Sequence, residues 1–345
     1  MKVMEKMQYV VMKTDDIRTN LATEQYLMNS DKIKPPFMLF YIEKPCIIVG
    51  RNQNTMEEIN QKYCEEHGIT ITRRLSGGGA MYQDLGNLCF SFVVPAENQK
   101  FGDFKSLVQP VVDALHKMGV TGAETTGRND IVVDGKKFSG NAMYTRGGKT
   151  FSHGTLMFDV DTDAVADALR VPKDKIESKG IKSVRSRVTN LKPYVSEEYK
   201  DFDTFQFRDE LIKLIWGVDS LEEAQQYEYQ LDDEDKKGIE AIEQKLYKNW
   251  DWVYGKSPEF TVKRRKHFTS GTIDARFLVE DGKIKDIKIY GDFFGSGDVK
   301  DVEEALRGLK YDVSTIKEAL GKLDLNKYFV GIDAEDIKEL ISTQQ

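Results

Sequence analysis

The chain has 345 residues, a formal net charge of −7, 40% hydrophobic residues and 31% charged residues. This length suggests about two domains, and the acidic balance argues against a dedicated nucleic-acid binder. No apolar run is long enough for a membrane helix, and the N-terminus lacks a signal-peptide core. The three separated cysteines form no zinc or disulfide pattern, so we expect a protein of the reducing cytoplasm. We also expect a monomer.

Apolar patterning predicts the elements of the first third in order. Strands are expected over 8–12, 38–42 and 45–50, and a helix over 19–30. A single helix is expected from Thr55 to Gly68, with Glu58 in the capping-box position. A strand, a glycine-rich loop and a second strand follow over 69–94. The next helix, over 101–118, contains Pro110 and is therefore not expected to be straight.

The rest of the chain alternates hairpins with helices. Asp134-Gly135 predicts a β-hairpin turn within 127–142, which places Lys137 and Ser139 on one face of the second strand. A strand over 152–158, a basic stretch over 171–190 and helices over 204–216 and 232–249 follow. Strands over 260–265, 273–279 and 284–290 then precede two short helices and a last one over 333–341. This order predicts a mixed, largely antiparallel α/β (α+β) domain over 1–250 and a small α+β domain over 256–345.

One segment carries the strongest chemical signal: Arg73, Arg74, Leu75, Ser76 and three consecutive glycines, Gly77, Gly78 and Gly79. Glycines leave backbone N–H groups open to an anion, and arginine matches phosphate or carboxylate. The alternative is an ordinary tight turn with a solvated arginine pair. The segment is neither a Walker loop nor a dinucleotide fingerprint.

Three glycine-punctuated segments could meet in one cleft: the glycine loop, the Lys137 hairpin and the strand of His153. Lysine neutralises phosphate as a compact charge, and Asn129 and Asp130 could orient a ribose, a metal ion or a nucleophile. The chain shows no nucleophile elbow, no paired-carboxylate signature and no metal cluster. Electrostatic stabilisation of an anionic transition state is therefore the chemistry that these residues favour.

Several motifs in matching order make the chain resemble the lipoate–protein ligases of the long, two-domain form. They are 74–80, Gly86-Asn87, 127–130, 137–142, 153–156 and 183–190, and the last looks like that family's adenylate loop. The resemblance implies a biotin/lipoate ligase fold, with a catalytic lipoate- and ATP-binding domain followed by an accessory domain. It also implies two steps: lipoate and ATP form lipoyl-AMP, and a lysine of an acceptor lipoyl domain then displaces AMP.

The resemblance assigns roles to single residues. Lys137 would be catalytic, at the α-phosphate and the acyl carbonyl, and Asp130 would hold Mg²⁺. Arg74 would contact phosphate or the lipoyl carboxyl. The residues expected to bind ATP or lipoyl-adenylate are Arg74, Gly77, Gly78, Gly79, Ala80, Met81, Tyr82, Asn129, Asp130, Lys137, Ser139, Gly140, His153 and Arg185.

Each assignment has a structural alternative. Lys137 could be an exposed hairpin lysine, Met81 a core residue, Asn129 and Asp130 a turn-capping pair and His153 a structural histidine. The segment 185–187 could be a solvated basic loop. Residues 46–49 and 90–93 are candidate walls of an apolar lipoyl slot, and the basic stretch 173–187 could attract acidic lipoyl domains, such as 2-oxoacid dehydrogenase E2 subunits and the glycine cleavage H protein.

Other functions remain possible at this point. An octanoyl transferase of the same fold would need no ATP, and some use a cysteine nucleophile. Cys89 lies in a buried-looking run, which is a poor place for a thiolate. A biotin ligase would carry a Gly-Arg-Gly-Arg type of loop in place of Ser-Gly-Gly-Gly. A non-catalytic lipoate or nucleotide binder is the third alternative.

Overall fold

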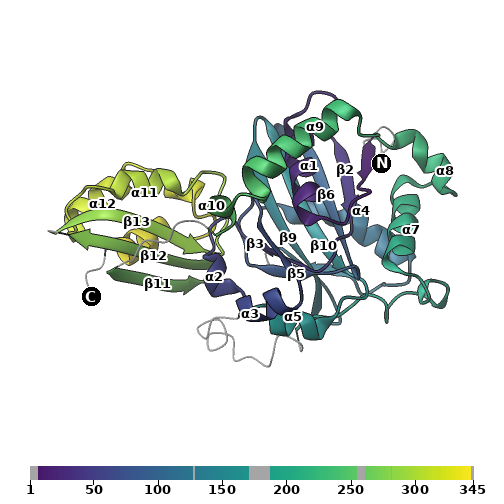
Figure 1. The fold of residues 1–345 in the computed structure, drawn as a ribbon, viewed down its shortest axis with the longest axis horizontal. Coiled ribbons are helices and arrows are strands. Elements are labelled where there is room, and N and C mark those ends of the chain that lie inside the picture. Colours follow the sequence, from purple (N-terminus) through teal and green to yellow (C-terminus); the bar gives the residue numbers. More distant parts are fainter. Residues whose placement is uncertain (1–6, 127–128, 171–186, 255–260, 281, 343–345) are drawn as a thin grey trace.

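The computed structural model describes residues 7–126, 129–170, 187–254, 261–280 and 282–342. These residues form a larger N-terminal unit and a smaller C-terminal unit joined near α10 (Trp250–Val253) (Figure 1). Among the described residues, no helix combines the length and the apolar character needed to cross a membrane.

A seven-stranded sheet is the centre of the larger unit. Its strands lie in the order β1-β2-β6-β10-β9-β8-β7, and every neighbouring pair is antiparallel except β1 and β2. The mixed, largely antiparallel architecture is thus confirmed. The strand bounds are β1 (Gln8–Val11), β2 (Phe37–Tyr41), β6 (Asn87–Pro95), β7 (Glu124–Thr126), β8 (Asp130–Val133), β9 (Lys136–Arg146) and β10 (Lys149–Met157).

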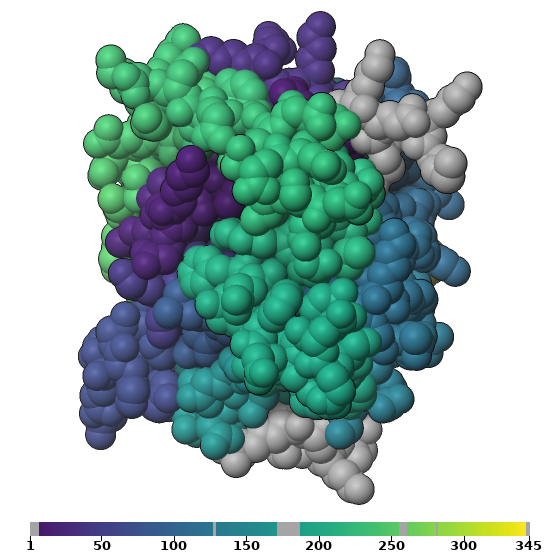
Figure 2. Space-filling model, turned by 90° about the vertical axis from the view of Figure 1, so that its right-hand side faces the viewer, coloured from purple at the N-terminus to yellow at the C-terminus, as the bar shows by residue number. Residues whose placement is uncertain are grey.

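Helices cover both faces of this sheet (Figure 1). One face packs on α4 (Phe104–Lys117) and α7 (Thr204–Trp216), and the other on α1 (Ile17–Asn29) and α9 (Asp233–Ile242). Figure 2 shows the segment after residue 200 lying beside the N-terminal strand, where Tyr229 N donates to Tyr9 O. α4 continues through Pro110. The predicted helix over 232–249 divides into α9 and a π-helical segment, Glu243–Tyr247.

A second, three-stranded sheet packs beside the first and carries the glycine loop. It has the order β4-β3-β5, with bounds β3 (Cys46–Val49), β4 (Thr70–Arg73) and β5 (Met81–Gln83). The single helix expected over 55–68 is wrong. Two short helices, α2 (Thr55–Glu58) and α3 (Gln61–Glu66), flank Ile59, which pairs with Leu169 instead of continuing the helix. The Asn60 side chain accepts from Tyr63 N and starts α3.

The hairpin of β8 and β9 turns where the sequence predicts. Asp134 and Gly135 both have positive φ, 51° and 69°, as a type I′ turn requires. The register shifts by one residue past the turn, because Val132 pairs with Lys137 but Ile131 pairs with Ser139. This β-bulge changes which side chains share a face of β9. The other helices of the larger unit are α5 (Thr162–Ala168) and α8 (Leu221–Ala224).

The smaller unit is an antiparallel three-stranded sheet with helices packed on one face (Figure 1). Alternate strand residues such as Ile273, Phe277 and Ile287 are fully buried beneath those helices. The predicted α+β composition is correct. Its elements are β11 (Val262–Phe268), β12 (Gly271–Glu280), β13 (Lys283–Gly291), α11 (Lys300–Leu306), α12 (Val313–Gly321) and α13 (Ala334–Ser342).

Candidate functional site

Arg74 shapes the glycine turn that links β4 to β5. Its side chain is buried, and Nη2 donates to Gly77 O and Gly79 O, both at 2.8 Å, while Nη1 donates to Ile48 O at 3.1 Å. Burial lowers the pKa of Arg74 to about 10. We expected this guanidinium to contact phosphate or the lipoyl carboxyl. In this structure Nη1 and Nη2 donate to carbonyl oxygens of the protein. Its role here is to hold the turn in shape.

The three glycines of the turn have different surroundings. A Cβ on Gly77 would lie 2.4 Å from Phe293 O of the smaller unit. Gly78 has φ +96°, and a Cβ there would lie 2.9 Å from Arg74 Nη2. A Cβ on Gly79 would meet nothing within 4 Å. Packing and backbone conformation therefore require two of the glycines, and Gly79 leaves open space for a ligand.

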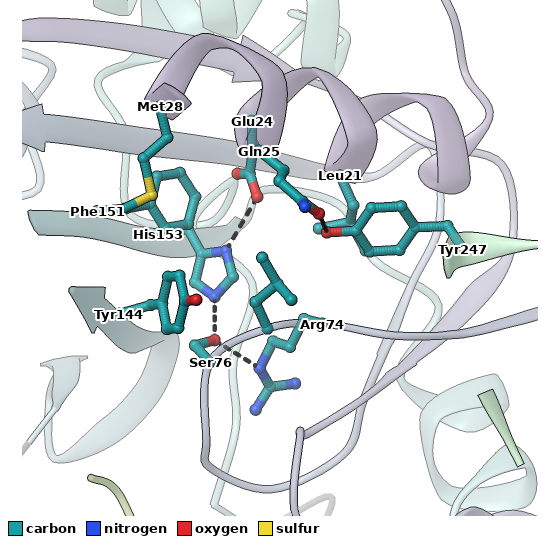
Figure 3. A pocket seen from close by; sticks show the side chains of 11 residues that line it. Leu21, Glu24, Gln25, Met28, Arg74, Ser76, Tyr144, Phe151, His153 and Tyr247 are labelled. Atoms are coloured by element: carbon teal, nitrogen blue, oxygen red, sulfur yellow. Dashed lines mark hydrogen bonds and ion pairs between the residues drawn. The ribbon is translucent and has the colours of Figure 1, made fainter. Parts of the chain in front are cut away.

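A chain of hydrogen bonds begins at this turn and runs into the core (Figure 3). Arg74 Nε donates to Ser76 Oγ at 3.1 Å, and Ser76 Oγ lies 2.7 Å from His153 Nε2. The other ring nitrogen, His153 Nδ1, lies 3.3 Å from Glu24 Oε2. The turn is thus connected through β10 to the buried face of α1.

Glu24 is buried but well supplied with donors. Its Oε1 accepts from the hydroxyls of Tyr41 and Ser91, on β2 and β6. Sheet register explains the arrangement, because His153 lies directly opposite Ser91 in the β6–β10 ladder. Three strands and one helix therefore hold this carboxylate and the imidazole in fixed positions.

Apolar side chains form the rest of the pocket around His153 (Figure 3). The main ones are Leu21, Met28, Tyr144, Phe151 and Tyr247. We expected residues 46–49 and 90–93 to form these walls. Neither segment lines this pocket, which lies between α1, β9, β10 and the π-helical segment. From the two expected segments, Ile48 lines the adjoining cavity, which Cys89 also lines.

Lys137 lies near the start of β9. Its Nζ forms a 2.6 Å ion pair with Asp130 Oδ1, and both side chains are more than a third exposed. The amine also lies 3.0 Å from the Cβ position of Gly140, so Lys137 crosses Gly140 and not Ser139. Ser139 Oγ instead accepts from Asn141 Nδ2. The expected shared face of Lys137 and Ser139 is wrong because the β-bulge reverses the alternation.

The hairpin and the glycine turn meet at one cavity. Gly140, which Lys137 crosses, lines it together with Arg74, Met81 and His153. This cavity adjoins the apolar pocket, since both are lined by Leu21, Arg74 and His153. Met81 thus faces the cleft.

Not every predicted site residue points into that cavity. Tyr82 on β5 and Ala80 just before it pack on the opposite side, in the cluster around Ile47, as strand alternation requires. Asn129 Nδ2 donates to Asn141 O at 2.6 Å and so caps the end of the hairpin. Arg185 lies outside the described residues.

The C-terminal part of the predicted adenylate loop, 183–190, contacts Lys137 through its backbone. Lys137 N donates to Arg187 O at 2.8 Å, and Thr189 N donates to Lys137 O at 2.9 Å. No pattern in the sequence indicated this pairing. Glu24, Tyr144 and Tyr247 are further pocket residues that the sequence did not reveal, although a carboxylate on the apolar side of an amphipathic helix could have drawn attention to Glu24.

Cys89 does not have the surroundings of a nucleophile. It is fully buried, and burial together with Glu43 and Glu24 raises its pKa well above the usual range. Among the described residues, no group of three or more His, Cys, Asp or Glu side chains could hold a metal ion.

Comparison with known proteins shows which family has this fold and this cleft. Residues 16–215 match the family described as lipoyl protein ligase A/B catalytic domain, and residues 257–341 match the bacterial lipoate protein ligase C-terminus. The chain therefore belongs to the lipoate–protein ligase family and is an enzyme of the ligase class.

Individual relatives support this assignment over nearly the whole chain. The lipoate-protein ligase LplJ of Bacillus subtilis is 48% identical over 327 residues, covering 95% of this chain and 97% of the relative. P. falciparum LipL1, solved in complex with lipoate, has a TM-score of 0.76 at 26% identity and covers 97% of this chain and 99% of its own. A bipartite ligase of Thermoplasma acidophilum, described with its E2 lipoyl domain, has a TM-score of 0.60 at 26% identity, with 74% and 99% covered.

Proposed function

We propose that the cleft between the glycine turn and the Lys137 hairpin makes lipoyl-AMP from lipoate and ATP and then transfers the lipoyl group to a lysine of an acceptor lipoyl domain. The lipoate carboxylate attacks the α-phosphorus and releases pyrophosphate, and the lysine amine then displaces AMP. The first step joins two anions, so it needs positive charge and fixed positions.

One observation carries the proposal: a single cavity is lined both by the flanks of the glycine turn and by Gly140, over which Lys137 lies. The apolar pocket beside it suits the hydrocarbon chain and dithiolane of lipoate. The junction of the two cavities, at Arg74 and His153, is where the acyl carboxylate would meet the α-phosphate. The relative solved with lipoate supports the same ligand.

Lys137 would exchange partners when nucleotide binds. It is ion-paired with Asp130 and partly exposed, so the attraction is weak enough for a phosphate to replace the carboxylate. Mg²⁺ would be held by the released Asp130 carboxylate together with nucleotide phosphates, which fits an ion that often takes one or two protein carboxylates. A bound Mg²⁺ would neutralise phosphate charge.

The acceptor and the division of the chain complete the proposal. The acceptor is a lipoyl domain, as in the E2 proteins and the H protein, and the Thermoplasma relative was described with such a domain.

We place the catalytic domain at residues 1–250 and the accessory domain at 256–345. The accessory domain contacts the site in this structure, because Phe293 O abuts Gly77.

Lipoate-dependent exchange of labelled pyrophosphate into ATP tests the proposal. The full chain should catalyse this exchange and, in a separate assay, attach lipoate to an apo lipoyl domain. Absence of exchange from folded protein would refute adenylation. A protein that moved octanoyl groups between carriers without ATP, and lost this activity in the Cys89→Ala variant, would instead be a transferase.

A further inference from the structure

The hydrogen-bond chain of the cleft has a direction that its donors and acceptors fix. The Glu24 carboxylate accepts from two hydroxyls and faces His153 Nδ1, so that nitrogen carries the ring proton. In the neutral imidazole, Nε2 is then the acceptor, and the Ser76 hydroxyl donates to it across 2.7 Å. Glu24 thereby sets the tautomer that makes His153 a base toward the cleft.

Ser76 has room for one more hydrogen bond. A hydroxyl oxygen has one proton and two lone pairs. The Ser76 hydroxyl donates its proton in a hydrogen bond to His153 Nε2, and one lone pair accepts from Arg74 Nε–H. The second lone pair has no donor among the described residues. Ser76 lines the apolar pocket close to its junction with the second cavity, so that lone pair is available to a substrate N–H.

We propose that Ser76, His153 and Glu24 form a proton relay for the second half-reaction, the attack of the acceptor lysine. This inference rests on the proposed function. The neutral amine forms a C–N bond to the acyl carbon, the C–O bond to AMP breaks, and AMP leaves with that electron pair. The surplus proton on nitrogen passes to Ser76 Oγ as the Ser76 proton passes to His153 Nε2. Glu24 holds the resulting imidazolium, which later returns the proton to water.

The relay belongs to only one of the two steps. In adenylation a carboxylate displaces pyrophosphate, and no proton has to leave the nucleophile. Amide formation cannot finish without losing a proton from nitrogen, so a base there accelerates the step by about 10² to 10⁴-fold. The rate of adenylation therefore reports on substrate binding without proton transfer, whereas the rate of amide formation also reports on proton transfer.

Other titratable groups face His153 from the surrounding elements. They are Glu24 on α1, Tyr41 on β2, Arg74 in the glycine turn, Cys89 on β6, Tyr144 on β9 and Tyr247 in the π-helical segment. Burial raises the pKa values of Tyr41, Cys89 and Tyr247 well above their usual ranges and lowers that of Arg74 to about 10. Near neutral pH, Tyr41, Cys89 and Tyr247 therefore stay neutral and Arg74 stays positively charged.

The His153→Gln variant of the full chain tests the relay, because glutamine can hydrogen-bond but is not a base. We would measure lipoate-dependent pyrophosphate exchange, and single-turnover transfer from enzyme-bound lipoyl-AMP to an apo lipoyl domain, across about pH 5.5–9, which spans the usual range of histidine. Transfer should fall about 100-fold more than exchange, and its pH dependence should flatten. His116→Gln, which changes a half-buried histidine bonded to Ala123 O, is the matched control.

The outcomes separate the hypotheses. The relay would be overturned by equal losses in both half-reactions, that is, by a ratio of transfer rate to exchange rate within about twofold of the wild-type ratio. His153 would then be a binding residue. If His153→Gln does not fold, as judged by circular dichroism, Ser76→Ala and Glu24→Gln carry the same test with the same expected ratio. Wild-type protein that shows no exchange at all would instead refute the proposed function.

Discussion

The two sides of the cleft hold their charged groups in opposite ways. On the glycine-turn side, Arg74 is buried and bound to carbonyl oxygens of the protein. On the hairpin side, Lys137 is partly exposed, and its partner Asp130 is equally accessible. A buried, fully bonded cation maintains shape, whereas an exposed ion pair can change partners at little cost. We therefore expect changes on the turn side to affect stability first and changes on the hairpin side to affect catalysis first.

The largest effect is expected for Lys137→Ala. Removing one preorganised donor to a developing anion lowers rates by about 10² to 10³-fold, so pyrophosphate exchange should fall by that factor or more. The free energy of unfolding should barely change, because the ion pair with Asp130 is exposed. Exchange assays and thermal melts of this variant and of Lys136→Ala, its exposed neighbour, check this. Equal activity in the two variants would contradict the catalytic role.

The turn side is tested by Gly77→Ala against Gly79→Ala. The new methyl at position 77 would overlap Phe293 O of the smaller unit, so we expect a loss of about 1–3 kcal/mol of stability. The methyl at position 79 meets nothing, and stability should stay within about 0.5 kcal/mol while ATP binding weakens. Denaturation curves and nucleotide titrations give both readouts. Similar stability for the two variants would show that the two units do not meet at Gly77.

A buried carboxyl beneath the cleft provides a pH-dependent test. Glu43 is fully buried, and burial, aided by Glu24, raises its pKa well above the usual range against the smaller, opposite effect of the Cys89 thiol. The folded state therefore keeps Glu43 protonated when the unfolded chain has lost that proton. The contribution of Glu43 to the free energy of unfolding is fully present below the pKa that this carboxyl has in the unfolded chain. It is lost as pH rises above that value, by up to about 1.4 kcal/mol per pH unit.

The variant Glu43→Gln should remove that pH dependence. It should gain stability over the wild type at pH 7 and show little difference at about pH 4, below the usual carboxyl range. Chemical denaturation at several pH values measures this, with exposed Glu97→Gln as the control. If the free energy of unfolding changed between pH 5 and pH 7 by the same amount in the wild type and in Glu43→Gln, the prediction would be wrong.

The smallest effect is expected between the two units. Arg276 binds Glu57 through two hydrogen bonds of 2.8 and 2.6 Å, and this contact lowers the pKa of Glu57. Glu57 is about half exposed, with 49% of its side chain accessible, so Glu57→Gln should cost less than about 1 kcal/mol. The loss should appear above the usual carboxyl pKa, disappear as pH falls toward about 3, and shrink in 1 M salt. Melts that show no dependence on salt would contradict an ionic contact.

Local patterns in the sequence were enough for most of the elements. The Asp134-Gly135 turn, the helix over 204–216 and the three C-terminal strands follow from rules that act within a few residues. The glycine triplet was recognisable as a special turn for the same reason. Where a distant contact competed, these rules failed: Ile59 pairs with Leu169 and breaks the expected helix.

The sequence by itself thus determined the types of element, the positions of the main turns and a family resemblance. Only the tertiary structure decided that Ser76, His153 and Glu24 form one chain, since they lie 77 and 129 residues apart along the backbone. It also decided that Lys137 lies over Gly140 and that Gly77 meets Phe293. Periodicity reports which face of an element is apolar, but it does not record strand register, bulges or which distant surface covers that face.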